Sequence, residues 1–287
     1  MKVENRVLAC VDQSKFAEYV TDYAAWAAKR LDAPLELLHA INRHPELSDS
    51  DDHSGAIGFN AQEKLLNQLS EADEARSKAA REQGRLFLND LRERAVAAGA
   101  PAVDVRQRHG ELTETLVEVE QTMRLIVLGR RGRSAEATQR DLGRNVENTV
   151  RSLRRPILAV TEPFSPPQNI MVAFDGGMTT RRGIERIATS PLFRDMPIHI
   201  LMSGKKRADA SRQLDWAEQR LSSAGFSTTV ELLPGDAERV IGQAILDRQI
   251  DLLVMGAYNH SPLRSALFGS KTSDLLRTSR IPTLLLR

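Results

Sequence analysis

Residues 6–12 read Arg-Val-Leu-Ala-Cys-Val-Asp and residues 169–175 read Asn-Ile-Met-Val-Ala-Phe-Asp, so an apolar run that ends in aspartate occurs twice. Later, Leu-Ile-Val-Leu-Gly at 125–129 has its counterpart in Leu-Leu-Val-Met-Gly at 252–256. Each is followed by a polar loop, a glycine, a helical stretch and an apolar run led by proline. Because four landmarks recur in one order, the chain contains two copies of a unit of roughly 120–160 residues.

Within each copy, short runs of Val, Ile and Leu alternate with longer stretches of helical spacing. Such runs are typical of strands covered on both faces, as in a parallel sheet, and the helical stretches supply the crossovers. We therefore expect an α/β fold of two tandem Rossmann-like domains, each a five-stranded parallel sheet flanked by helices. The strands expected are 5–11, 35–41, 102–108, 124–129 and 156–160, then 169–174, 197–202, 227–233, 251–256 and 281–286. The helices expected are 15–31, 61–98, 111–121 and 144–154, then 179–188, 208–224, 236–247 and 270–278.

The boundary between the copies is the segment 161–168, where three prolines fall within five residues and favour an extended linker. We place the domains at 1–162 and 168–287. The first copy is longer because of a polar segment at 42–60 and the helix that follows it. That helix keeps its apolar spacing throughout, with a break near Gly84 left open.

Composition excludes several classes of protein. Of 287 residues 41% are hydrophobic, which is enough for a core, and the net charge of +2 lacks the basic excess of a nucleic-acid-binding chain. The single cysteine, Cys10, lies in an apolar strand, so we expect it to be buried, in a protein of a reducing compartment. No apolar run approaches 18 residues, so we expect a cytoplasmic protein without a membrane partner.

Ligands of an open parallel sheet bind beyond the carboxyl ends of its strands, where the strand order reverses. In the second half, Asp175 ends the first strand and Gly256 ends the fourth. The loop after Gly256 runs to Gly269 and Ser270, where a helix is expected to start. Glycine permits close backbone approach, and a helix N-terminus offers free N–H groups, which together suit a phosphate. Taken singly, a turn glycine and an N-cap serine remain the simpler interpretation.

With this loop the sequence resembles the universal stress protein family in its tandem two-domain form. Nucleotide-binding members carry Gly-x2-Gly-x9-Gly-(Ser/Thr) after strand four. The second half keeps that spacing with Asn259 in place of one glycine. In the first half Gly129 and Gly132 are kept, but ten residues separate Gly132 from Gly143, and Arg144 replaces the Ser or Thr.

The resemblance implies a strand order of 3-2-1-4-5 and ATP as the ligand, with Mg²⁺ as an optional companion. The nucleotide-binding residues that it implies in the second half are Asp175, Met202, Gly256, His260, Arg264, Gly269 and Ser270. The equivalent, doubtful site of the first half comprises Asp12, Ala40, Gly129, Gly132 and Gly143. We expect Arg144 to fill the first pocket rather than bind a phosphate there, so that nucleotide binds in the second half.

No nucleophile, base and acid can be assembled into a catalytic site, and neither a P-loop nor a dinucleotide fingerprint is present. The resemblance therefore points to an ATP-binding regulatory module in the stress response, with slow ATP hydrolysis left open. The main alternative is a nucleotide-free dimeric stress protein that acts through protein contacts, and a nucleotidyltransferase or ligase is a third. The partners expected are an adenine nucleotide, the other half of the chain in an intrachain pseudo-dimer, and an unidentified protein. A homodimer of the whole chain is left open, and neither nucleic acid nor a metal site is expected.

Overall fold

The computed structural model describes residues 5–41, 59–130, 144–160, 162–204, 209–257 and 279–287. The strands are β1 (Arg6–Val11), β2 (Leu35–Ile41), β3 (Val103–His109), β4 (Met123–Gly129), β5 (Ile157–Val160), β6 (Ile170–Ala173), β7 (Ile198–Ser203), β8 (Thr228–Leu233), β9 (Leu252–Gly256) and β10 (Thr283–Leu286). The α-helices are α1 (Ala17–Leu31), α2 (Phe59–Ala97), α3 (Leu112–Val119), α4 (Arg144–Ser152), α5 (Met178–Thr189), α6 (Ala210–Ser222) and α7 (Ala237–Asp247). Short 3₁₀ turns are η1 (Glu120–Thr122) and η3 (Pro191–Phe193). The expected elements within the described residues are confirmed to within three residues at their ends, and helix 270–278 lies outside them.

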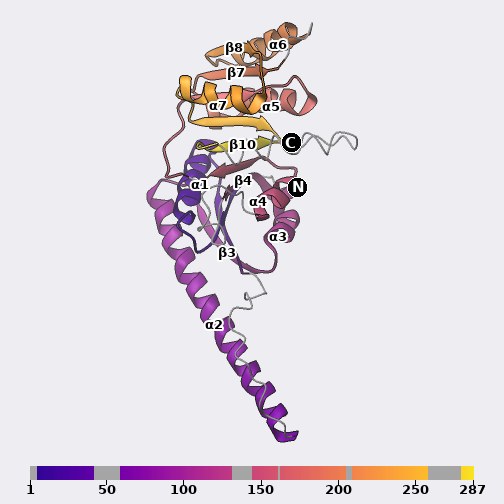
Figure 1. Cartoon of the computed structure of the whole chain (residues 1–287). Coiled ribbons are helices and arrows are strands. Elements are labelled where there is room, and N and C mark those ends of the chain that lie inside the picture. Colours follow the sequence, from indigo (N-terminus) through magenta and orange to yellow (C-terminus); the bar gives the residue numbers. More distant parts are fainter. Residues whose placement is uncertain (1–4, 42–58, 131–143, 161, 205–208, 258–278) are drawn as a thin grey trace.

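All ten strands form one sheet in the order β3-β2-β1-β4-β5-β10-β9-β6-β7-β8. Within each half the strands are parallel, in the expected order 3-2-1-4-5. The halves join where β5 and β10 pair antiparallel, with Leu284 opposite Leu158. The last strand of each half, which would otherwise be an exposed apolar edge, is therefore central in the joined sheet (Figure 1).

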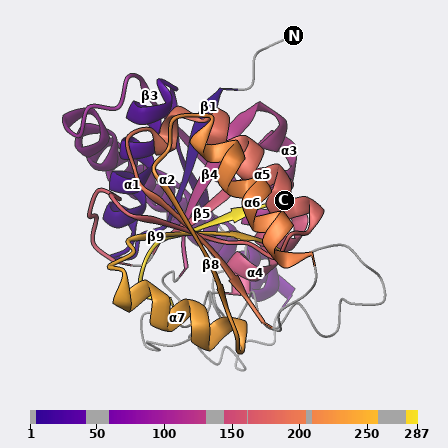
Figure 2. The ribbon, with the colours of Figure 1, turned by 90° about the horizontal axis from the view of Figure 1, so that it is seen from above.

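Side chains alternate across this sheet, and each face supports a separate core. On β1, Val7 belongs to the core beneath α1, α2, α5 and α6, whereas Leu8 belongs to the core beneath α3, α4 and α7. Seen from above, the strands fan out around a common centre with α7 on one side and α5 and α6 on the other (Figure 2). This fan is the right-handed twist that parallel sheets accumulate.

Helix α2 is continuous through Gly84, without the break that the sequence left open. A Cβ at Gly84 would lie 2.1 Å from Gln107 Nε2, so the glycine allows the helix to lie close on β3. Towards its C-terminal end Leu88, Leu91 and Ala95 are buried against the sheet. The N-terminal part of α2 continues past the edge strand β3 and away from the body of the molecule (Figure 1).

The linker is held against both halves. Ser165 N donates to Tyr23 Oη at 3.4 Å, and the Phe164 ring lies edge-on to Tyr23 with centroids 4.9 Å apart. Burial raises the pKa of the Tyr23 hydroxyl. Asp251 accepts from the backbone N–H groups of Gln168 and Asn169 at 2.9–3.0 Å.

Among the described helices, none has both the length and the apolar composition that spanning a bilayer requires.

Candidate functional site

The strand order reverses between β6 and β9, which is where the parallel-sheet rule places a ligand. These two strands run parallel, with Ala173 opposite Met255. Their carboxyl ends therefore bring Asp175 and Gly256 to the same edge of the sheet.

Asp175 organises the start of α5. Its Oδ1 accepts from Gly177 N at 2.8 Å and from Thr180 Oγ1 at 2.6 Å. The positive end of the helix favours a carboxylate beside it, and here the carboxylate also holds the N-cap residue Gly177. Asp175 thus has a structural role at the turn into α5, in addition to the ligand role expected for it.

Gly256 lies directly against the same turn. A Cβ at this position would be 3.2 Å from Thr180 Cγ2 and 3.4 Å from Thr179 Cγ2, so a side chain would press on these two methyl groups. The structure therefore brings Asp175, Thr180 and Gly256 together at this edge of the sheet. Thr180 was not predicted from the sequence, although its position five residues after Asp175, where a helix begins, was an available signal.

Gln213 of α6 covers the turn after Asp175. Gly176 has a φ of +75°, and an added Cβ would overlap the Gln213 side chain, so only glycine fits there. Gln213 Nε2 donates to the Asp209 carboxylate, which directs the amide oxygen towards Gly176. That oxygen is buried and makes no hydrogen bond within the described part of the chain. A buried acceptor of this kind is costly unless a donor meets it.

Two aromatic rings and a guanidinium group pack together near the turn that follows β6. Phe174 and Trp216 stack with their centroids 6.4 Å apart, and the Arg181 guanidinium lies 4.7 Å from the Trp216 ring centroid. Arg181 Nε also donates to Gly176 O at 3.3 Å. Met202, whose backbone is expected beside a bound base, is buried, with only 3% of the residue exposed. Its position at the end of β7, next to β6, agrees with a backbone role.

The first half has the same strand order, but different side chains stand at the equivalent positions. Asp12 Oδ1 accepts from Ser14 Oγ at 2.5 Å. Leu35 of β2 pairs with Val7 as Ile198 of β7 pairs with Ile170, so the position equivalent to Met202 is His39. Ala40, the residue predicted for the first site, is one residue further along and corresponds to Ser203. The prediction was wrong by one position because an apolar run alone does not fix the register.

His39 packs beside the end of β1 in the first half. Its ring is buried, its Nδ1 lies 3.0 Å from Val11 O, and it packs edge-on against Phe87 with centroids 5.5 Å apart. The His39 ring therefore lies next to the end of β1, with the Phe87 ring against it.

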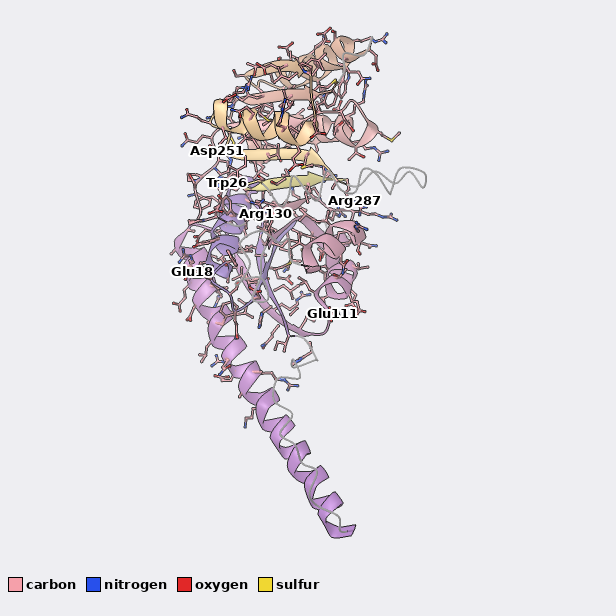
Figure 3. All side chains as sticks on the ribbon, in the orientation of Figure 1. Glu18, Trp26, Glu111, Arg130, Asp251 and Arg287 are labelled. Carbon is pink, nitrogen blue, oxygen red and sulfur yellow. The ribbon has the colours of Figure 1, made fainter. Side chains whose placement is uncertain are left out.

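Arg130, the residue after Gly129 in the first loop motif, is only 2% exposed. Its N–H donates to Val160 O at 2.7 Å, and its Nη2 reaches across the chain to Ile281 O at 3.3 Å. Figure 3 shows Arg130 beside β10, at the boundary of the halves. The equivalent residue in the second half is Ala257, whose N–H donates to Leu286 O at 2.9 Å.

Several predicted residues lie outside the described part of the chain: Gly132, Gly143, His260, Arg264, Gly269 and Ser270. Helix α4 begins at Arg144, directly after Gly143. Within the described residues no cluster of His, Cys, Asp and Glu could hold a metal ion. Burial raises the pKa of the Cys10 thiol to about 12, so this thiol is unreactive near neutral pH.

The fold agrees with what family comparison finds. A family model matches residues 4–161 and again residues 167–287, and its description is the universal stress protein family. The chain belongs to this family. A curated relative, universal stress protein Slr1230 of Synechocystis sp., is 35% identical over 284 residues, which cover 98% of this chain and 99% of the relative.

Solved universal stress proteins share the tandem architecture at low sequence identity. A structure from Archaeoglobus fulgidus has a TM-score of 0.70 at 16% identity, covering 99% of this chain and 96% of its own. A putative universal stress protein from Pseudomonas aeruginosa has a TM-score of 0.64 at 16% identity, covering 99% and 94%. These two structures support the fold of the tandem universal stress protein chain.

Proposed function

We propose that this universal stress protein is an ATP-binding regulatory module of the cytoplasm, with its nucleotide in the second half. The observation that carries the proposal is the convergence of Asp175, Thr180 and Gly256 at the point where the strand order reverses. In this proposal the Asp175 carboxylate binds the ribose, and the phosphates approach the backbone that follows Gly256, which packs against Thr180. Mg²⁺ would accompany the phosphates as a counter-ion.

The halves differ in ways that favour one site per chain. The first crevice holds the His39 and Phe87 rings, and Arg144 stands where the family's motif has Ser or Thr. The second half keeps Ser270 and the family's loop spacing. We propose binding without catalysis as the main activity, since no nucleophile and base are assembled at the described part of this crevice; slow hydrolysis is a question for the same preparation.

The test is to titrate ATP calorimetrically into the intact protein and into Gly269→Val and Gly143→Val. Valine at 269 should block close approach and remove one or two phosphate hydrogen bonds of about 1.5–3 kcal/mol each, which weakens binding at least tenfold. The matched change at 143 should leave affinity nearly unchanged. Two equivalent sites per chain, or loss of binding from the Gly143 variant alone, would overturn the assignment.

A second function, nucleotide-free action through protein contacts, is favoured by α2. This helix extends past the sheet edge, and on its described part Leu86 and Val96 are 51% and 55% exposed (Figure 1). Mass spectrometry of small molecules released from the purified, denatured protein separates the two functions. Bound adenine nucleotide supports the first, and a clean sample together with no heat of ATP binding supports the second.

A further inference from the structure

A cavity of about 460 Å³ opens on the first half, away from the nucleotide crevice. Its lining residues come from β1, β2, β3 and α2: Arg6, Glu36, Arg92, Val103, Asp104, Val105 and Arg106. Arg6, Glu36 and Asp104 stand at the starts of their strands, whereas Asp12 follows the end of β1. The cavity and the first-half crevice therefore lie at opposite ends of the same strands.

Glu36 is the buried centre of this cavity, with only 2% of its side chain exposed. Arg6 Nη1 donates to its Oε2 at 3.0 Å. Arg106 Nη2 donates to the same oxygen at 3.3 Å, and Arg106 Nε lies 2.9 Å from Oε1 without the alignment of a hydrogen bond. Burying a carboxylate between two guanidinium groups is costly, and replacing such a group by apolar residues often stabilises a protein. A role in holding the two arginines in place explains its presence better than a role in stability.

The two held arginines do not spend all their donors on Glu36, since a guanidinium carries five N–H groups. A third guanidinium, Arg92, approaches from α2, where its Nε donates to Val103 O at 3.2 Å. Asp104 stands at the rim, 64% exposed, and accepts from Arg6 Nη1 at 3.0 Å. Unlike Glu36, this carboxylate can leave the cavity by rotating into solvent.

The charges of the lining define what the cavity can accept. Three arginines against Glu36 alone leave 3 − 1 = +2, and Asp104 reduces this to +1 while it stays in place. A phosphate monoester carries about −1.5 to −2 at neutral pH, and planar guanidinium groups match its oxygens with paired hydrogen bonds. A single carboxylate would leave part of the charge uncompensated.

We propose that this cavity binds a small phosphate monoester, with Arg6, Arg92 and Arg106 as its ligands and Asp104 as the internal anion that the phosphate displaces. Glu36 acts as a positioning residue that holds two of the three guanidinium groups before the ligand arrives. Such preorganisation reduces the entropy lost on binding. The site stands whether or not the nucleotide proposal holds, because the two share no residue.

The second half lacks this site, which supplies an internal control. The strand register places His199, Thr229 and Glu231 where the first half has Glu36, Asp104 and Arg106. His199 Nδ1 lies 2.7 Å from Thr229 Oγ1, and Arg248 pairs with Glu231. In the second half, the positions of Glu36 and Asp104 therefore carry no carboxylate, and the position of Arg106 carries a carboxylate instead of a guanidinium.

The experiment titrates ribose 5-phosphate into the full chain in phosphate-free buffer, with ribose and malonate as probes of the sugar and of carboxylates. The informative variants leave the Glu36 pairs intact, so that folding is kept. Arg92→Gln should weaken ribose 5-phosphate binding at least tenfold, and Asp104→Asn should strengthen it severalfold because the competing charge is gone. Arg248→Gln in the second half should change nothing.

Opposite effects of the Arg92 and Asp104 variants support the proposal. Absence of binding to the unaltered protein, equal binding of ribose, tighter binding of malonate, or weaker binding by Asp104→Asn would each overturn it. ATP titrated into Arg92→Gln tests the separation of the sites. Unchanged ATP affinity agrees with two sites, and loss of ATP binding would make the cavity the nucleotide site instead.

Discussion

The two halves share a strand order and a strand register, yet equivalent positions hold different side chains. His39 stands at the position that Met202 has in the second half, and Glu36 is replaced by His199. In a dimer of identical chains both copies would have to change together. A tandem chain removes that constraint, so each half can keep the fold while only one keeps a given site.

Arg130 and Ala257 show the same divergence at the boundary of the halves. Their backbone N–H groups make equivalent hydrogen bonds, to Val160 O and Leu286 O. Arg130, unlike Ala257, sends a buried guanidinium across the boundary, to Ile281 O. Ile281 precedes β10, so this contact ties the residue that follows β4 to the segment that leads into β10.

Separating the halves should have the largest effect. Residues 168–287 expressed alone leave β10 without β5, and Leu284 and Leu285, at most 3% exposed in the intact chain, would stand at a sheet edge. We expect a dimer that pairs β10 with its own copy, or an insoluble product. Light scattering coupled to size exclusion measures this, and a well-behaved monomer at high concentration would show that the halves do not need each other.

Arg130→Ala should be the most damaging of the single substitutions that distinguish the halves. It leaves a buried cavity and an unmatched carbonyl, for a loss of about 2–4 kcal/mol in the free energy of unfolding. Arg130→Met keeps the apolar stem and should lose less. Chemical denaturation measures both, with exposed Arg85→Gln as the control that should unfold as the parent does. Equal unfolding curves for Arg130→Ala and the control would show that Arg130 does not stabilise the boundary between the halves.

Asp175→Ala and Asp12→Ala compare the two strand-end carboxylates. Asp175 accepts two hydrogen bonds at the start of α5, and its loss should cost roughly 1 kcal/mol of stability together with a marked loss of ATP affinity. Asp12→Ala should leave ATP affinity unchanged. Calorimetric titration of both variants checks this, and equal losses would indicate two working sites.

His199 should give the smallest effect, a pH dependence of the stability of the fold. Burial lowers the pKa of His199 from its ordinary value of 6.5, so the folded state binds this proton less readily than the unfolded state. Stability is therefore fully present above about pH 6.5 and declines as pH falls through the window between 6.5 and the lower folded pKa. His199→Gln should flatten this part of the stability profile; an unchanged slope would assign it to other groups.

Much of the fold could be predicted because its signals are local. Each short apolar run, like the group of prolines at 163, 166 and 167, spans only a few residues, and the recurrence of the runs can be read by comparing the two halves of the sequence. The continuity of α2 through Gly84 could not be predicted from neighbouring residues. Gly84 is needed because the helix lies close on Gln107 of β3, and helical periodicity does not reveal that contact.

The candidate site divides in the same way. Asp175 and Gly256 could be found because both end an apolar run, and ends of parallel strands meet at one sheet edge. Thr180 and Gln213 could not, since their place in the crevice depends on the direction of α5 and the packing of α6. The equivalence of His39 with Met202 depended on register, which a run of apolar residues leaves free by one step.

By itself, the sequence determined that this chain is two copies of a parallel α/β unit and that strand ends carry its polar residues. Only the tertiary structure decided that β5 pairs with β10, that Arg130 is buried across the boundary, and that Arg6, Glu36 and Arg106 meet at one cavity. The reason is physical. Backbone periodicity follows from neighbouring residues, whereas the meeting of charges 30 to 100 positions apart follows from the order, twist and register of strands that the whole chain must form together.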